Sequence, residues 1–471
     1  MITMASSHVV DAIDPKRNVG FWEAVAQSAA LVSPAVGLTA GNVYVAQYAG
    51  FASPLTFVTA FVICVAIARV ISGYASRITV AGSFYTYLTQ TFGPVAGFVS
   101  GAMQLGAYLI LLIFQPLFFA TFMTSTFPAL GGHWAIWACA ICAFSVILTI
   151  SGVRLSLRAG LLLLAIEMSA FTVLAVIILL KGGADGHSIT PFLPSASLQG
   201  FSGLLLGNVF TIFAFVGFES ATTLSGEVRN PSKTIPRAVM ATTVVLGAFF
   251  VLLTYCEVIG FGINESGLKE LTTNSSPFAD LASRFGGSGL QLFIICATGF
   301  SLLALNLVTM SAAARLISAL GRDRFLPAWL AQQNKAGAPA NAAVTLGVLA
   351  ALTAVILGSE YTPESVGGWT SFLATLFFII SYAMLIIGLP IFIKRRFPNE
   401  FNAFEHAVIP ALAFAGVALV AYGNIYPFPA APLGYFVYVA LLCVLIAVAF
   451  AWAIQVRDPD RLSRIAQTLG D

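Results

Sequence analysis

The stretch Phe213-Ala-Phe-Val-Gly-Phe-Glu-Ser220 places a glycine and a carboxylate inside an apolar segment. The segment begins at Phe201 and leaves the apolar region as a basic, proline-containing exit that ends at Arg237. An acidic residue within an apolar span is costly and therefore indicates a functional site. Gly217 beside it permits local unwinding of a helix. We therefore expect the chemistry of this protein to lie in residues 201–237.

The composition restricts the class of protein. Of 471 residues, 59% are hydrophobic and only 9% are charged, whereas soluble domains carry about 25% charged residues. This composition predicts a protein that lies in a lipid bilayer. The net charge of +3 gives no reason to expect a nucleic-acid partner. The histidines form no cluster. Cys139 and Cys142 have the CxxC spacing of zinc and redox sites, but they lie in an apolar run with no second pair. We therefore expect no metal site and no cofactor.

A transmembrane helix needs about 20 apolar residues. Twelve segments meet this requirement: 21–48, 53–75, 94–125, 133–151, 156–180, 201–225, 237–262, 288–319, 342–358, 367–392, 406–425 and 432–456. With both termini cytoplasmic, only Lys181, Lys269 and Arg284 of the 22 Lys and Arg residues fall on the outer side. This bias follows the positive-inside rule. We predict an all-α, multi-pass protein of the cytoplasmic (inner) membrane, with tails 1–19 and 457–471 in the cytoplasm.

Two of the spans carry helix-breaking residues. The first contains Leu31-Val-Ser-Pro-Ala-Val-Gly-Leu38, and its proline removes a backbone donor and clashes with the preceding turn. The same number of residues separates Gly20 from Gly37 as separates Gly200 from Gly217. Spans 1 and 6 have opposite directions, as expected for inverted halves of five helices each. Interrupted segments at corresponding positions of two halves indicate the binding site of a transporter.

Several motifs occur together in one order along the chain. They are Val80–Tyr87 with Gly93-Pro94, Phe213–Ser220, Glu227–Pro231 with Ile235-Pro236, Ala314–Leu316 with Gly321–Pro327, and Gly337–Pro339. Over about residues 20–456 the chain thereby resembles the amino acid–polyamine–organocation superfamily of secondary transporters. The resemblance implies a LeuT-like fold with a first inverted repeat at 20–181, a second at 200–395 and two extra helices at 400–456. It implies transport by alternating access.

The chain also departs from this superfamily in three places. Gly73-Tyr74 stands at the end of span 2, where many members have an acidic residue. Ala35-Val36-Gly37 stands where members usually carry Gly-Ser-Gly or a similar sequence. Several members have a lysine in the middle of span 5, in the place of a sodium ion, and this position is Glu167 here. The coupling ion, H⁺ or Na⁺, therefore stays open.

An amino acid presents a carboxylate and an ammonium group to its site. The amides of Val36, Gly37 and Leu38 at the start of the outer half of span 1 suit the carboxylate. The carbonyls of Phe213 to Val216 at the end of the first half of span 6 suit the ammonium group. We expect Phe215 to act as a gate and Asn306 to help line the pocket. The residues expected to bind substrate are Ser33, Ala35, Val36, Gly37, Tyr108, Phe213, Ala214, Val216 and Gly217.

Acidic residues are the candidates for ion coupling. Glu167 follows Arg158 by about 13 Å of helix, which places it near the middle of the bilayer. Glu219 lies beside the break in span 6. Both are candidates to bind the coupling ion. We expect Glu257 to reach the outer interface and to be solvated there, and Glu23 to serve as a gate or cap near the inner end.

These features predict a secondary active transporter of amino acids or related amines, and not an enzyme. A polyamine or organic-cation exchanger is the alternative within the same superfamily. A channel is a more distant one, because the spans show only scattered polar residues and no continuous polar lining. The sequence leaves three questions open: which small molecule is carried, whether transport is by symport, exchange or uniport, and whether the protein is a monomer or a homodimer.

Overall fold

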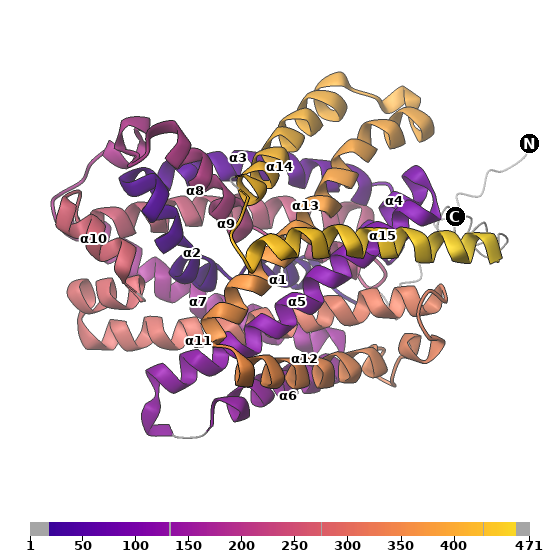
Figure 1. The fold of residues 1–471 in the computed structure, drawn as a ribbon, viewed down its shortest axis with the longest axis horizontal. Coiled ribbons are helices and arrows are strands. Elements are labelled where there is room, and N and C mark those ends of the chain that lie inside the picture. Colours follow the sequence, from indigo (N-terminus) through magenta and orange to yellow (C-terminus); the bar gives the residue numbers. More distant parts are fainter. Residues whose placement is uncertain (1–17, 131–132, 275, 427, 458–471) are drawn as a thin grey trace, which may run out of the picture.

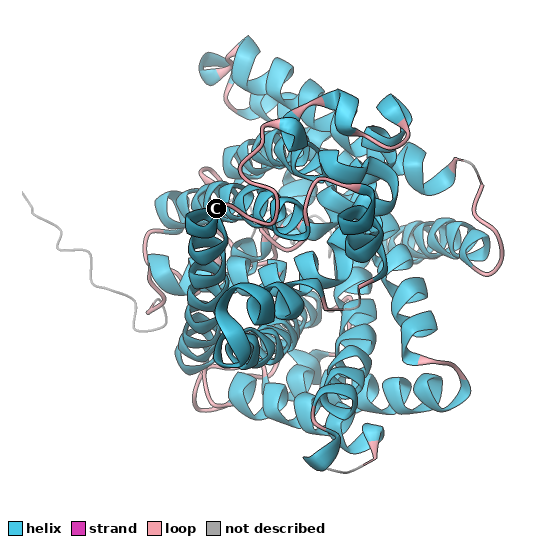
Figure 2. Cartoon of the chain, turned by 90° about the vertical axis from the view of Figure 1, so that its left-hand side faces the viewer, coloured by secondary structure: helices cyan, strands magenta, loops and turns pink. Residues whose placement is uncertain are grey.

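The computed structural model describes residues 18–130, 133–274, 276–426 and 428–457, so the predicted tails lie almost wholly outside the described residues. Within these ranges the chain is helical, apart from loops and one isolated parallel bridge between Val19 and Val228 (Figure 2). The first half contains α1 (Phe21–Val32), α2 (Pro34–Ala49), α3 (Ser53–Ala75), α4 (Phe84–Phe92), α5 (Pro94–Thr126), α6 (Trp134–Ile150) and α7 (Val153–Lys181). The second contains α8 (Gly200–Ala214), α9 (Pro231–Phe261), α10 (Glu265–Thr273), α11 (Pro277–Arg322), α12 (Ala340–Glu360) and α13 (Pro363–Arg396), followed by α14 (Ile409–Ile425) and α15 (Leu433–Arg457).

Short helical turns connect several of these helices. They are η1 (Gly50–Ala52), η2 (Pro128–Leu130), η3 (Thr190–Phe192), η4 (Pro194–Ala196), η5 (Ser220–Leu224), η6 (Ala328–Ala331), η7 (Pro398–Glu400) and the π-helical turn η8 (Phe404–Val408). We call the end of the molecule at which α15 finishes the terminal end, and the opposite end, which carries α10, the far end (Figure 1).

The helices form a membrane-spanning bundle. In the described part of the chain, nine helices are long and apolar enough to cross a bilayer, and α6 and α8 are shorter apolar helices. Each of the twelve predicted spans coincides with a helix or with a pair of helices. Large apolar side chains also cover the outside of α15, where Leu445 is 65% exposed. Such a surface is stable against lipid and not against water, which confirms the expected class of helical membrane protein.

The two predicted interruptions are present. Ser33 ends α1 and precedes α2 with φ 50° and ψ 74°, so the first break lies one residue before Pro34 and four before Gly37. Helix α8 ends at Ala214, and the chain then makes a series of turns through Gly217, whose φ is +113°, before η5 begins. Because a left-handed φ is strained for residues with a Cβ, glycine is the residue that suits this turn.

Helices α4 and α10 were not predicted from the sequence. Residues 263–274 have the composition of a solvated loop, yet Glu265–Thr273 forms α10, with the Asn264 side chain accepting a hydrogen bond from the Gly267 amide (2.8 Å). Gly267 and Leu271 are buried where α10 packs on α2 and α9. The far end is therefore covered by a helix that the apolar pattern alone does not reveal.

Candidate functional site

The two breaks meet in the middle of the bundle. Helix α2 packs along α8, and a Cβ added at Gly37 would lie 3.7 Å from the carbonyl oxygen of Ala214. On the other side of the breaks, the Ser220 hydroxyl donates to the Gln27 carbonyl (3.0 Å) and the Ala221 amide donates to the Ser28 hydroxyl (2.9 Å). Each half of span 1 is thus paired with one half of span 6.

Unpaired backbone groups remain at this meeting point. The amide of Val36 donates to no group in the described chain, and the carbonyls of Ala214 and Val216 accept no hydrogen bond there. Unpaired buried backbone groups are rare, since each costs about as much as a lost hydrogen bond. One donor and two acceptors are therefore available to a polar ligand.

Not all the expected backbone groups are free. The prediction of a free amide was wrong for Gly37, which donates to the Ser33 carbonyl (2.9 Å) because α2 already begins at Pro34. The carbonyl of Phe213 accepts from the Val216 amide (3.0 Å), and that of Phe215 accepts from the Phe218 amide (3.3 Å). Consecutive tight turns after α8 supply the hydrogen bonds to these two carbonyls. The sequence alone does not reveal these turns.

Most of the predicted binding residues are buried around this point. Ser33, Ala35, Val36, Ala214 and Gly217 are buried, whereas Gly37, Phe213 and Val216 keep some accessible surface.

Two polar contacts hold the first break in place. The Ser33 and Ser301 hydroxyls are hydrogen-bonded at 2.6 Å, which ties the break to α11. The Ala35 amide donates to Glu167 Oε1 (2.6 Å), so a carboxylate from α7 caps the start of α2, where the helix dipole favours negative charge. Glu167 is fully buried, and its Oε2 has no partner in the described residues.

Glu219 organises the second break. Its Oε2 accepts hydrogen bonds from the Gly217 amide (3.0 Å) and from the Tyr382 hydroxyl (2.8 Å). Its Oε1 accepts from the Tyr108 hydroxyl (3.3 Å). The carboxyl group is fully buried. It therefore links the turn after α8 to α5 and α13.

Tyr382 is a site residue that sequence reasoning missed. It lies in the apolar segment of α13 with no neighbouring motif to distinguish it from the other tyrosines of the chain. Tyr108, predicted to line the pocket, bonds to Glu219 and also accepts from the Gln104 side chain (3.3 Å). Only the packing of α5 and α13 around span 6 brings the two hydroxyl groups to one carboxylate.

The side chains of two other predicted residues are engaged in packing or in hydrogen bonds elsewhere in the bundle. Phe215 is buried and packs edge-to-face on Phe250 of α9, with ring centroids 5.0 Å apart, and its gating role stays a prediction. Asn306 accepts from Ser145 (2.6 Å) and donates to Gln115 (3.2 Å), so its amide is used to join α5, α6 and α11. The expectation that Asn306 lines the pocket has no support in these contacts.

The prediction that Glu257 is solvated was wrong. Its side chain is completely buried and accepts a hydrogen bond from Asn42 Nδ2 of α2. Its distance along α9 from Arg237 suggested the outer interface, but in the fold α9 packs against both α2 and α10. Glu23, by contrast, caps α1 as expected, accepting from the Gly20 amide (3.2 Å), and lies 3.8 Å from both Arg154 and Arg158.

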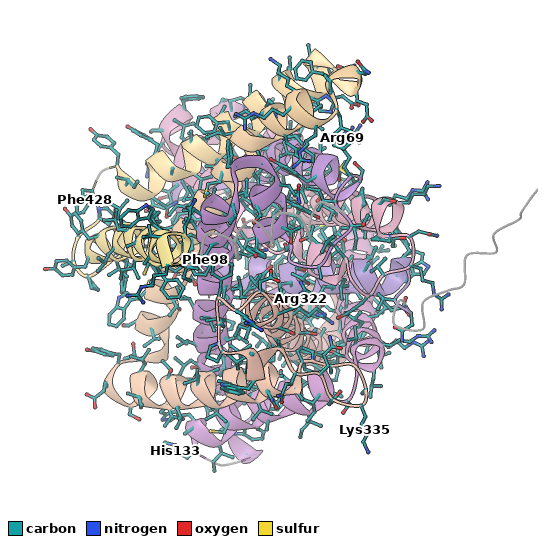
Figure 3. The ribbon with its side chains drawn as sticks, turned by 90° about the vertical axis from the view of Figure 1, so that its right-hand side faces the viewer. Arg69, Phe98, His133, Arg322, Lys335 and Phe428 are labelled. Carbon is teal, nitrogen blue, oxygen red and sulfur yellow. The ribbon has the colours of Figure 1, made fainter. Side chains whose placement is uncertain are left out.

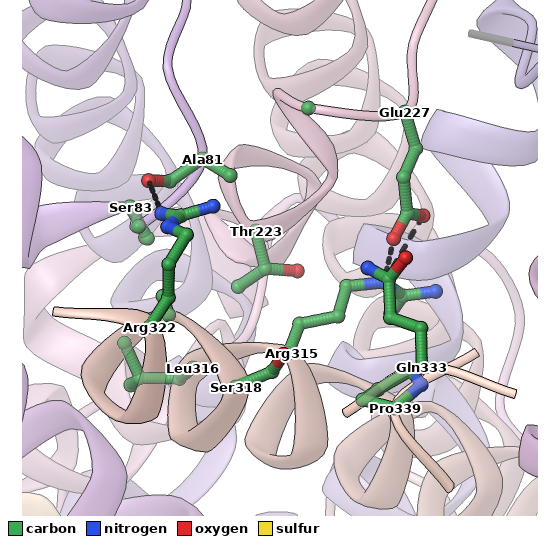
Figure 4. A pocket seen from close by; sticks show the side chains of 13 residues that line it. Ala81, Ser83, Thr223, Glu227, Arg315, Leu316, Ser318, Arg322, Gln333 and Pro339 are labelled. Atoms are coloured by element: carbon green, nitrogen blue, oxygen red, sulfur yellow. Dashed lines mark hydrogen bonds and ion pairs between the residues drawn. The ribbon is translucent and has the colours of Figure 1, made fainter. Parts of the chain in front are cut away.

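A separate pocket opens near the terminal end (Figure 4). Arg315 of α11 lies across it at 3.2 Å from the Glu227 carboxylate, and Arg322 donates to the Ala81 carbonyl (3.5 Å). Arg315 is only 8% exposed. This ion pair joins the exit of span 6 to α11, and the pocket does not include the unpaired groups at the two breaks.

Such an all-helical membrane protein, with two interrupted helices that meet at their breaks, has the architecture of a small-molecule transporter. Comparison with known families agrees, because the family described as Amino acid permease matches residues 24–462. The chain belongs to this family, within the amino acid–polyamine–organocation superfamily.

Several characterised relatives are similar over much of the chain. The branched-chain amino acid permease BcaP of Lactococcus lactis subsp. cremoris (strain MG1363) is 25% identical, covering 83% of this chain and 86% of its own length. The cationic amino acid transporter 7, chloroplastic, of Arabidopsis thaliana is 24% identical, over 60% of this chain and 50% of its own. The polyamine transporter PUT1 of Oryza sativa subsp. japonica is 25% identical, over 65% of this chain and 55% of its own.

Proposed function

We propose that this protein is a secondary active transporter that moves amino acids or related amines across the cytoplasmic membrane by alternating access. The observation that carries the proposal is the group of unpaired backbone atoms at the breaks, namely the Val36 amide and the carbonyls of Ala214 and Val216. The amide lies at the positive end of the α2 dipole and suits a carboxylate. The two carbonyls suit an ammonium group.

The same atoms favour an amino acid over a polyamine. A polyamine has no carboxylate, so it would occupy the carbonyls of Ala214 and Val216 and leave the Val36 amide unpaired. An unpaired buried donor costs about 1–3 kcal/mol. An exchanger of polyamines or other organic cations is the alternative, supported by the similarity to PUT1.

The packing of the helices supports a repeat of five plus five helices. In the two proposed repeats, α7 occupies the position that corresponds to α13, and α5 the position that corresponds to α11. Accordingly, the extensive contact of α7 with α11 has its counterpart in the contact of α13 with α5. Corresponding helices also pack on each other, as in the pairs α3 with α9 and α6 with α12. Together with the pairing of the half-helices, this arrangement supports rocking about Ser33 and Gly217 as the basis of alternating access.

The distribution of basic residues supports the proposed orientation. Arg69, Arg322 and Lys335 are labelled in Figure 3, which views the molecule from the side at which α15 ends. The connections expected on the other side carry few basic residues, among them Lys181 and Lys269. By the positive-inside rule, this distribution favours a cytoplasmic position for the terminal end.

Glu167→Gln is expected to flatten the dependence of uptake on pH or on sodium concentration. Glutamine retains an oxygen for the Ala35 amide, so the cap on α2 is kept, but it can neither release a proton nor carry the charge that a sodium ion requires. The measurement is initial uptake into proteoliposomes across a pH series, with and without sodium. Glu360→Gln, at the exposed end of α12, is the matched control. A profile like that of the wild type would exclude Glu167 from coupling.

A thermal-shift screen of the detergent-purified protein tests the proposed function. A ligand at a hundred times its Kd stabilises a protein by about 2.7 kcal/mol. We expect amino acids to raise the Tm, and the corresponding amines without a carboxylate to raise it less, with sodium present or absent. Stabilisation by polyamines alone would favour the alternative exchanger. The absence of any shift across both classes, with no uptake in proteoliposomes, would contradict the proposal.

A further inference from the structure

A third fully buried carboxyl group lies in the far half of the molecule, apart from the two breaks. Glu257 of α9 and Asn42 of α2 are both 0% exposed. Asn42 follows Pro34 by eight residues, about 12 Å of helix beyond the first break. Asn42 Nδ2 donates to Glu257 Oε2, and this is the only hydrogen bond of the Glu257 carboxyl group in the described chain.

The remaining polar atoms of the pair have no partner. Glu257 Oε1 and Asn42 Oδ1 are buried and unbonded within the described ranges, as is Thr39 Oγ1 one turn earlier on α2. The buried carboxylate of Glu219, by contrast, accepts hydrogen bonds from three donors. Glu257 is thus as buried as a core residue, yet it keeps an unused hydrogen-bond acceptor, as a residue of a binding site does.

No cation offsets a charge on Glu257 in the part of the chain that the structure describes. The ionisable groups on the elements around α9 are engaged with other atoms or exposed. Among the cations, Lys181 donates to the Phe285 carbonyl, Arg284 pairs with Glu270 and Asp280, Arg69 pairs with Glu405, and Arg154 and Arg158 lie near Glu23. Among the other ionisable groups, Asp185 accepts from Ile263 and Asn264, Cys256 donates to the Ala175 carbonyl, and Glu167 caps α2. Tyr44, Glu265 and Lys269 are exposed. The hydrogen bond from Arg284 lowers the pKa of Glu270.

An unpaired ionised carboxylate is strongly disfavoured in such a place, because it has lost its hydration without gaining a compensating charge. A neutral carboxylic acid removes this cost and gains an O–H donor. Asn42 can serve both forms, because its amide presents a donor on one side and an acceptor on the other. Nδ2 donates to the ionised group, and Oδ1, once the amide has turned over, accepts from the neutral one.

We propose that Glu257 and Asn42 form a proton-binding site between α2 and α9, in addition to any coupling group at the breaks. The proton comes from water at the far end, binds a Glu257 oxygen and is held by donation to Asn42 Oδ1. On release it returns to water and leaves a carboxylate that accepts from Nδ2. Helix α10 lies over this region and packs on both helices, with Gln47 of α2 donating to the Thr272 carbonyl (3.3 Å).

The site bears on the proposed transport because of its place on α2. Asn42 and Val36 are on the same half-helix, six residues apart. The proton on Glu257 therefore determines how firmly the far half of span 1 is held to α9. This consequence rests on the proposed function, whereas the binding of the proton itself does not.

The test is the pH dependence of the Tm of the purified full-length protein. Removing the proton from buried Glu257 leaves an uncompensated charge, so the Tm of the wild type is expected to fall with rising pH more steeply than that of Glu257→Gln. Glu265→Gln, an exposed acid on α10, is the matched control and should follow the wild type. Identical profiles for the wild type and Glu257→Gln would overturn the proposal. So would a sodium-dependent rise in Tm that Glu257→Gln abolishes, because the site would then bind sodium.

A second variant keeps the test decisive if Glu257→Gln is not recovered in folded form. Asn42→Ala removes the partner of both protonation states and leaves the acid, so the pH at which the Tm declines should move. An unchanged midpoint would contradict the role of Asn42. If the wild type transports no amino acid or amine, the proposed function is wrong. The Tm measurements would still test proton binding at Glu257, because they do not depend on transport.

Discussion

Gly217→Ala is expected to reduce substrate uptake by roughly five- to 150-fold, the factor that corresponds to about 1–3 kcal/mol of backbone strain. Gly217 has a φ of +113°, and an added Cβ would lie 2.9 Å from the carbonyl carbon of Leu31 and closer still to the Leu31 side chain. Either the turn after α8 or the end of α1 must then move. Both carry the groups that face the substrate in the proposed site. Initial rates of uptake into proteoliposomes measure the loss, and Gly217→Val should abolish uptake altogether.

Gly41→Ala is the matched control for this substitution. Gly41 lies in α2, the partner half-helix, and a Cβ there meets nothing within 4 Å. The control should retain wild-type uptake. Elution as a single species and the Tm in detergent show whether each variant is folded. A folded Gly217→Ala protein with normal uptake would show that the turn is not part of the site.

Glu219→Gln is expected to lower uptake at least about tenfold. The carboxylate offers two acceptor oxygens to three donors, the Gly217 amide and the hydroxyls of Tyr108 and Tyr382. Glutamine offers one oxygen and an NH₂ group, so at least one donor must turn away or lose its partner, at a cost of about 1–3 kcal/mol. The turn at the second break is then held less firmly between α5 and α13. Uptake rate and Tm, measured together, separate loss of transport from loss of folding.

Tyr382→Phe is the control that removes a single donor and leaves the carboxylate in place. Its effect on uptake should be smaller than that of Glu219→Gln, because Gly217 and Tyr108 still hold the group. Equal losses in the two variants would assign the effect to the tyrosine alone. Normal uptake by Glu219→Gln would remove Glu219 both from the site and from the candidates for ion coupling.

Local residue chemistry accounts for what could be predicted from the sequence. Pro34 has no amide hydrogen, and Gly217 adopts a φ that other residues avoid, so both interruptions follow from single residues. The position of the first break was less accurate, because Ser33 and not Gly37 adopts the left-handed conformation. Whether a particular amide or carbonyl stays free depends on the turns around it, and those turns are not encoded by one residue.

Burial at the ends of the spans was the weakest prediction. Glu257 was expected in water because its position along α9 lies near the outer interface, and distance along a helix says nothing about what covers it. The polar residues 265–273 form α10 by a cap at Asn264 and by packing of Leu271. This helix packs on α2 and α9, which carry the buried Asn42 and Glu257. A short amphipathic helix leaves too weak a periodic signal to be distinguished from a loop.

The sequence by itself determined the class of protein and the location of its two broken helices, because hydropathy, proline and glycine act within a few residues of the chain. Only the tertiary structure decided which atoms face each other across the breaks. Gly37 lies beside the Ala214 carbonyl, Glu219 accepts a hydrogen bond from Tyr382 of a distant helix, and Glu257 accepts one from Asn42. These contacts join residues more than a hundred positions apart, so they depend on how whole helices pack.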